Sequence, residues 1–271
     1  MAKTKILIAV KTYPTLAEKY DELVCTAGFR EDGSWIRIYP IPFRKLEYDK
    51  RYNKYDWLEI DLVRNNSDFR PESYRPYSID SAFKITGHID TANNWELRKS
   101  IVLNNVYTNL GNLISDAQDK KKLTSLAVFK PTIIKDFIWK RVDREWDKFK
   151  LAKLKAKALQ LNLFSNSDNP FEVVRELPFE FSYVFSDDAG RESTLMIEDW
   201  ETGQLYWNCL KRNKGDEFKA CVDVKKKYFD DFAKTKNFYL GTTRQFHMIS
   251  PNPFIIIGTF YPPKDSQLSL F

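Results

Sequence analysis

Residues 23–39 read LVCTAGFREDGSWIRIY, and this stretch decides the fold. It holds two runs rich in β-branched and aromatic residues, 23–28 and 35–39, which favour strands. Asp32 and Gly33 lie between the runs and are the residue types of a tight hairpin turn. In the second run, aliphatic residues alternate with a face that carries two aromatic rings around an arginine, namely Trp35, Arg37 and Tyr39.

The same alternation recurs along the chain and predicts further strands. One is expected at 5–11, with Ile6, Ile8 and Val10 on one face. Others are expected at 55–63, 82–89, 132–139, 179–185, 193–197, 203–209, 237–241 and 254–260, with a loop at 65–77 and helices at 105–118, 143–160 and 217–234. The Ser, Asn, Asp and Pro residues of 165–170 are typical of a domain boundary. The pattern predicts a β-rich α+β protein with two small barrel-like lobes.

Composition narrows the classes of partner and cofactor. The chain has 271 residues, a net charge of +6 and a pI of about 9.0. This mild basic excess permits a polyanionic partner without requiring one. Three cysteines without C-x-x-C spacing and only two histidines argue against structural zinc and fit a cytosolic protein. The apolar run at 1–10 is too short to span a membrane. We therefore expect a cytoplasmic protein without a membrane partner, metal or cofactor.

The hairpin sequence resembles the start of the dual OB domain family, which has a Cys-x-Ala-Gly strand and a Trp-Ile-Arg return strand. The corresponding residues here are 25–28 and 35–37. The chain departs from the family at Ile38 and Tyr39, where the family has proline straight after the arginine. Segments that resemble the second barrel of the family lie at 181–185, 190–191, 195–199, 238–241 and 254–258. The resemblance implies OB-like barrels at 1–104 and 166–263, a basic helical insert and linker at 105–165, and a flexible tail at 264–271.

An OB barrel binds single-stranded nucleic acid on two of its strands and its rim loops. Aromatic rings stack on bases, and cations follow the backbone. The resemblance therefore implies a single-stranded or duplex nucleic-acid partner, contacted by Arg30, Trp35, Arg37, Tyr39 and Arg44 and by the basic-helix residues Lys148, Lys150, Lys153 and Lys157. In the alternative, Trp35 and Tyr39 are core residues and the lysines form a solvated surface. Arg37 is then a structural partner of Asp32 or Glu59.

Residues 267–271 read QLSLF and resemble the peptide by which bacterial replication and repair proteins dock on the DNA sliding clamp. The amide of Gln267 suits a polar pocket rim, while Leu268, Leu270 and Phe271 offer apolar surface for burial. The alternative for this tail is an unselected chain end. The same pattern recurs as QLNLF at 160–164, where its apolar residues could instead belong to the core.

These features favour a non-catalytic nucleic-acid-binding adaptor that is recruited to the clamp. Replication, repair and mobile-element or phage defence are the settings in which such an adaptor would act. The first alternative is a metal-dependent nuclease, whose candidate ligands are either Glu59 and Asp61 on one strand face, or Asp187, Asp188, Glu198 and Asp199. The second alternative is a protein-binding module without nucleic-acid contact.

Overall fold

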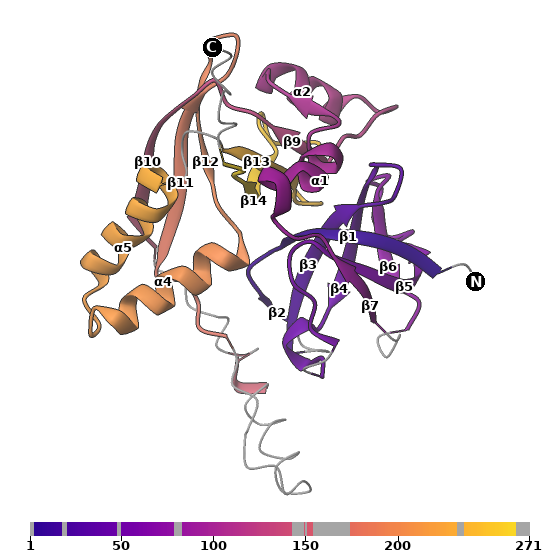
Figure 1. Cartoon of the computed structure of the whole chain (residues 1–271), viewed down its shortest axis with the longest axis horizontal. Coiled ribbons are helices and arrows are strands. Elements are labelled where there is room, and N and C mark those ends of the chain that lie inside the picture. The colour runs from indigo at the N-terminus through magenta and orange to yellow at the C-terminus, as the bar shows by residue number, and fades with distance from the viewer. Residues whose placement is uncertain are drawn as a thin grey trace, which may run out of the picture.

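The computed structural model of the chain describes residues 3–17, 21–47, 50–78, 83–142, 149, 151–153, 174–231 and 236–263. Strands form a closed barrel in the first part of the chain, whereas most of the helices lie in the second part (Figure 1). The prediction of a β-rich α+β fold is therefore confirmed. In the described ranges, no helix is both long enough and apolar enough to cross a membrane.

Five strands close the barrel of the first part. In order around the barrel they are β1 (Lys3–Lys11), β3 (Asp21–Phe29), β4 (Trp35–Ile41), β6 (Ser73–Pro76) and β5 (Asp56–Arg64), which returns to β1. β4 and β6 run parallel, and the other neighbours run antiparallel. Two short strands extend the sheet, β2 (Thr15–Ala17) beside β3 and β7 (Lys84–His88) beside β5, and the helical turn η1 (Phe43–Lys45) follows β4.

β1 is buried on both faces because it belongs to two cores. Ile6 and Ile8 belong to the core inside the barrel, whereas Leu7 and Ala9 pack with residues of the second half. The register between β1 and β3 shifts after Ile8, and this irregularity places Val10 with the outer residues. The prediction that Ile6, Ile8 and Val10 share one face is therefore wrong for Val10. A strand without a polar face requires cover on both sides.

Two sheets and a group of helices form the second half (Figure 1). One sheet contains β10 (Ile133–Arg141), β11 (Phe179–Ser186) and β12 (Glu192–Met196), and the other contains β14 (Phe254–Phe260), β13 (Asn237–Thr242), β9 (Leu126–Phe129) and β8 (Val106–Tyr107). A parallel bridge between Ile197 and Ile256 joins the two sheets. The segment from β12 to β13 contains α4 (Trp200–Arg212), α5 (Glu217–Lys225) and η3 (Lys226–Asp231), while α1 (Ala92–Val102) and α2 (Leu110–Gln118) lie on either side of β8 in the chain.

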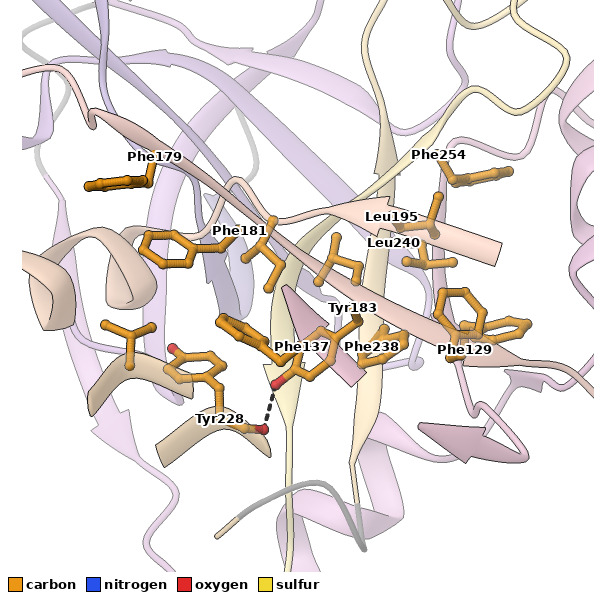
Figure 2. Close-up of a cluster of buried hydrophobic side chains, with 14 of the residues drawn as sticks. Phe129, Phe137, Phe179, Phe181, Tyr183, Leu195, Tyr228, Phe238, Leu240 and Phe254 are labelled. Atoms are coloured by element: carbon orange, nitrogen blue, oxygen red, sulfur yellow. Dashed lines mark hydrogen bonds between the residues drawn. The ribbon is translucent and has the colours of Figure 1, made fainter. Parts of the chain in front are cut away.

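Aromatic side chains fill the space between these sheets and helices (Figure 2). Tyr183 stacks with Phe238 at 5.0 Å between ring centroids and meets Phe137 edge-on at 5.0 Å. Its hydroxyl donates a 2.7 Å hydrogen bond to the backbone oxygen of Tyr228. The alternating aromatic residues of β11 all face this core, as the pattern at 179–185 predicts.

The described part of the predicted helical insert, 105–142, is an integral part of the second half. It contains α2, but it also contains β8, β9 and β10. β9 pairs with β13 and β10 pairs with β11, so these strands complete the two sheets. The predicted helix at 143–160 lies outside the described residues except for 149 and 151–153.

Elements outside this insert also differ from the sequence-based prediction. Residues 203–209, predicted as a strand, lie in α4, because Thr202, Tyr206 and Cys209 recur at helical spacing and are buried together. β6 occupies part of the loop predicted at 65–77, and its proline lies at the end of the strand, where it is tolerated. α1 has no predicted counterpart, since its sequence lacks an apolar stripe.

Gly28 of β3 has no room for a side chain, because a β-carbon there would meet the backbone carbonyl oxygen of Leu7 on β1. Gly28→Ala is expected to lower the free energy of unfolding by about 1–3 kcal/mol, since the two strands would have to move apart. Urea denaturation measures this loss. Gly87→Ala in β7 is the control, because its β-carbon would lie 3.9 Å from Trp57 Cδ1, an ordinary contact. Equal losses in the two variants would contradict the explanation.

Candidate nucleic-acid interface

The second half of the protein covers much of the outer face of the barrel. A shared core joins the two parts, and it includes Leu7, Ala9, Phe29, Val128, Tyr239, Ile257 and Phe260. Trp35 lies at the edge of this core, with its ring 4.1 Å from that of Phe29 and edge-on to Tyr239 at 5.8 Å between centroids. The predicted binding face of β4 is therefore largely occupied by the protein itself.

Arg37 links the two halves and does not face solvent. Its guanidinium donates hydrogen bonds to Ser125 Oγ at 2.8 Å, to the Ser125 carbonyl at 3.1 Å and to the Thr242 carbonyl at 3.4 Å. The side chain is buried, and this burial lowers its pKa. In this arrangement Arg37 is not accessible to nucleic acid, because it is buried and donates to groups of the second half. The alternative in which Arg37 has a structural role agrees better with this geometry, although its partners are groups of the second half rather than Asp32 or Glu59.

The structure separates the other predicted residues. Arg30 remains beside Trp35, and its guanidinium donates to the Trp35 carbonyl at 2.9 Å. Arg44 instead pairs with the buried carboxylate of Glu22 at 2.7 Å, while Tyr39 is exposed. Lys153 is exposed, and the predicted contacts Lys148, Lys150 and Lys157 lie outside the described residues, as do 160–164 and the tail 264–271.

A shallow groove lies along one margin of the interface between the halves, and we call it the rim groove. Its volume is about 490 Å³, and its lining includes Arg30, Trp35, Tyr74 and Lys122. The guanidinium of Arg30 lies 5.0 Å from the centre of the Tyr74 ring. Two carboxylates, Asp32 and Glu72, also line the groove, so its cations and anions are balanced.

A larger cavity lies at another part of the interface, and we call it the interface cavity. Its volume is about 590 Å³, which is within the usual range for small-ligand sites. Four cationic side chains line it, against a single carboxylate, that of Glu201, and four aromatic side chains contribute to its walls. The cations are Lys11, Lys54, Arg98 and Lys227, and the aromatic residues are Tyr55, Trp95, Trp200 and Tyr261.

Lys54 ties the barrel to α4 inside this cavity. Its ammonium group donates to Glu201 Oε2 at 2.9 Å and to the Thr259 carbonyl at 3.3 Å. Burial alone would lower the pKa of Lys54, but the carboxylates of Glu201 and Asp199 outweigh burial and raise it. Lys54 therefore stays charged, and Glu201 neutralises it. The remaining cations of the cavity have no second carboxylate among its lining residues.

Trp95 enters the interface cavity from a strained turn. Asn93, Asn94 and Trp95 have φ angles of 48°, 55° and 65°, which form a left-handed turn at the start of α1. This conformation costs roughly 1–2 kcal/mol per residue, and asparagine tolerates it better than tryptophan. Packing holds the turn in place, because the Trp95 ring lies 5.6 Å from Phe260 and 5.7 Å from Tyr261 between centroids. Strain of this kind is concentrated at functional sites.

Sequence patterns do not single out the residues of the interface cavity. They come from β1, the turn before β5, α1, α4, η3 and the end of β14, so no local spacing connects them. The consecutive asparagines before Trp95 are the one local signal, since asparagine is enriched in left-handed turns.

Two of the carboxylates considered for a nuclease have structural roles. Asp187 Oδ2 accepts a 3.0 Å hydrogen bond from the backbone nitrogen of Leu110, and Asp188 Oδ2 accepts one of 2.6 Å from Thr108 Oγ1. Both hold the start of α2. Among the residues that the structure describes, no group of three or more His, Cys, Asp or Glu side chains is placed to hold a metal ion.

Asp199, at the start of α4, gives the fold a dependence on pH. Burial raises its pKa to about 7, and its Oδ2 atom is buried without a hydrogen-bond partner in the described part of the chain. In the unfolded chain an aspartate titrates near 3.9. Protonation of the Asp199 carboxyl group therefore favours the folded state. This contribution to the free energy of unfolding is fully present below about pH 4 and is lost as the pH rises towards 7.

Asp199→Asn removes this titration and keeps the side-chain shape. The free energy of unfolding of this variant minus that of the unmodified protein is expected to increase between pH 5 and pH 8, by at most about 1.4 kcal/mol per pH unit. Urea denaturation at both pH values measures the difference. Asp230→Asn, at an exposed position, is the control. A difference for Asp199→Asn that does not change with pH would contradict the role of this carboxyl group.

Two family models match parts of the chain. Residues 2–104 match a family described as a domain of unknown function (DUF8758), and residues 107–271 match a second one (DUF8757). No curated protein matches the chain. The first match ends just after α1, and the second begins at Tyr107 in β8. Because the second match covers more than half of the sequence, the chain belongs to the family of the domain of unknown function DUF8757.

Proposed function

We propose that this protein is a nucleic-acid-binding, non-catalytic adaptor that its C-terminal peptide recruits to the DNA sliding clamp. The observation that carries the proposal is the pair of openings beside the interface between the halves. Both combine tryptophan or tyrosine rings with lysine or arginine side chains. Stacking on rings and neutralisation of phosphates by cations are the two interactions that bind single strands without requiring a defined sequence.

The strand connections support OB-like architecture in the first part of the chain. An OB fold is a five-stranded Greek-key barrel. In chain order the five barrel strands are β1, β3, β4, β5 and β6. The third of these, β4, pairs in parallel with the fifth, β6, and the fourth, β5, pairs with β1 and closes the barrel. This is the order expected of an OB barrel, with β2 and β7 as additions.

The second half supports the same interpretation if β9 and β10 are two segments of one strand, interrupted at Pro131. β9 pairs with β13, and β10 pairs with β11. Ile197, directly after β12, pairs in parallel with Ile256 of β14, which is the counterpart of the β4–β6 pair. α4 and α5 then fall between the third and fourth strands, where OB folds commonly carry a helix.

A purely protein-binding module is the weaker proposal, because cations lie directly against aromatic rings. The guanidinium of Arg98 is 3.9 Å from the centre of the Tyr55 ring, and Arg30 and Arg64 lie 5.0 and 5.8 Å from that of Tyr74. Arg30 and Tyr74 line the rim groove, where such a pair offers a base a flat surface and a phosphate a charge. The net charge of +6 favours a polyanion in the same way.

Trp35→Leu tests the rim groove. The leucine keeps an apolar contact with Phe29 but removes the ring, so single-strand affinity is expected to fall by roughly 1–3 kcal/mol. Fluorescence anisotropy with a labelled oligonucleotide measures the affinity, which should also fall as salt is added, because phosphate contacts release counterions.

Trp57→Leu is the matched control for Trp35→Leu. Trp57 is a half-buried tryptophan of the same shared core and lines neither opening. Its replacement should cost similar stability but leave affinity unchanged. Binding that is lost equally in both variants, or that does not depend on salt, would contradict a nucleic-acid site at the rim groove.

The clamp contact is tested at the C-terminus. Replacing Leu270 and Phe271 together by alanine is expected to abolish clamp binding, because a few buried apolar anchors dominate small interfaces. Ser269→Ala is the control and should leave an affinity of about micromolar, since this position is variable in the QLSLF pattern. Surface plasmon resonance on the bacterial clamp measures both. Unchanged binding by the double variant would show that the tail is not the anchor.

A further inference from the structure

The interface cavity has a larger positive charge than is needed to neutralise the phosphodiester groups of a single strand that passes through it. Glu201 neutralises Lys54, which leaves Lys11, Arg98 and Lys227. Arg98 is held by the backbone, because its guanidinium donates to the Ile89 carbonyl at 2.9 and 2.6 Å. The ammonium group of Lys11 donates to the Tyr52 carbonyl at 3.1 Å and lies 4.5 Å from the centre of the Phe43 ring. Lys227 is exposed on η3 at the edge of the cavity.

The number of cations indicates the charge of the occupant. A phosphodiester within a strand carries a single negative charge, whereas a terminal phosphomonoester carries about −1.5 to −2 at neutral pH. Lys11 and Lys227 together match the monoester, and Arg98 adds to the positive potential while it packs on Tyr55 and Trp95, at 3.9 and 4.9 Å from their ring centres. A compact volume of about 590 Å³ suits one nucleotide better than a run of several.

The aromatic side chains in the cavity walls provide a surface for a base, whereas the cations provide one for a phosphate. Trp95 and Tyr261 contact each other, with 5.7 Å between their centroids, while Trp200 comes from α4. A base placed against Trp95 would rest on a ring that the left-handed turn brings into the cavity wall and that packing against Phe260 and Tyr261 holds there. Positioning of this ring for a base would give the strained turn a functional role.

We propose that the interface cavity binds the terminal nucleotide of a single strand, with the base against Trp95 and a terminal phosphomonoester between Lys11 and Lys227. This inference rests on the proposed nucleic-acid function and adds to it a preference for phosphorylated ends. A free nucleoside monophosphate has the same chemistry, so the test separates the two sources.

The experiment compares three labelled oligonucleotides of one sequence with the full-length protein. One carries a 5′-phosphate, one a 3′-phosphate, and one has hydroxyl groups at both ends. One phosphorylated strand is expected to bind on the order of tenfold more tightly than the hydroxyl strand, because it gains charge-assisted hydrogen bonds. Equal affinity for all three strands would overturn the inference while leaving the proposed function intact.

Two pairs of variants locate the effect. Lys227→Gln should erase the preference for the phosphorylated strand, whereas Lys226→Gln, the exposed neighbour that does not line the cavity, should keep it. Trp95→Gly removes the ring and relieves the left-handed strain, and Asn94→Gly relieves strain while the ring remains. Only Trp95→Gly should weaken binding. A preference that persists in both Lys227→Gln and Trp95→Gly would overturn the inference.

A parallel titration with adenosine 5′-monophosphate, with adenosine as the control, separates failure of the site from failure of the proposed function. If no strand binds but adenosine 5′-monophosphate does, and Lys227→Gln abolishes this, the proposed function fails and the cavity remains a site for a nucleotide monoester. If neither strands nor adenosine 5′-monophosphate bind, both proposals fail.

Discussion

The burial of β1 on both faces is the constraint on which the rest of the structure depends. Its inward residues fill the barrel, while Leu7, Ala9 and Val10 require cover from outside. β9, β13 and β14 provide this cover, with Tyr239 at the centre of the contact. Because apolar burial is the main favourable term in folding, neither part could expose this face without a large cost. The two parts of the chain therefore share one packed core.

This packing determines where a ligand can bind. The face of β4 that the sequence predicts as a nucleic-acid surface is occupied by the second half, and Arg37 donates hydrogen bonds there to Ser125 and Thr242. The margins of the contact remain open, as the rim groove and the interface cavity. Hydrogen bonds hold Arg30, Lys54 and Arg98 at these openings, so part of the geometry that a ligand would need is already present in the free protein.

Local patterns in the sequence were sufficient for the hairpin at 23–39 and for the aromatic strand β11, because period-two alternation reflects burial on one face. They located β1 but assigned Val10 to the wrong face, and they failed at α4, because burial on two faces or aromatic content hides the period. They also could not show that Trp35 packs against Phe29 and Tyr239 at the edge of the shared core. The interface cavity could not be predicted from the sequence, because Lys54, Trp95 and Tyr261 come together only when the two halves pack against each other.

The most direct measurement is a crystal structure of the full-length protein with a terminally phosphorylated single strand. The terminal base should lie against Trp95, with its phosphate between Lys11 and Lys227 and with the contact around Tyr239 unchanged. A strand that instead lies across the outer face of β3 and β4, with the halves separated and Arg37 on a phosphate, would contradict the central claim that the interface is permanent and that binding takes place at its margins.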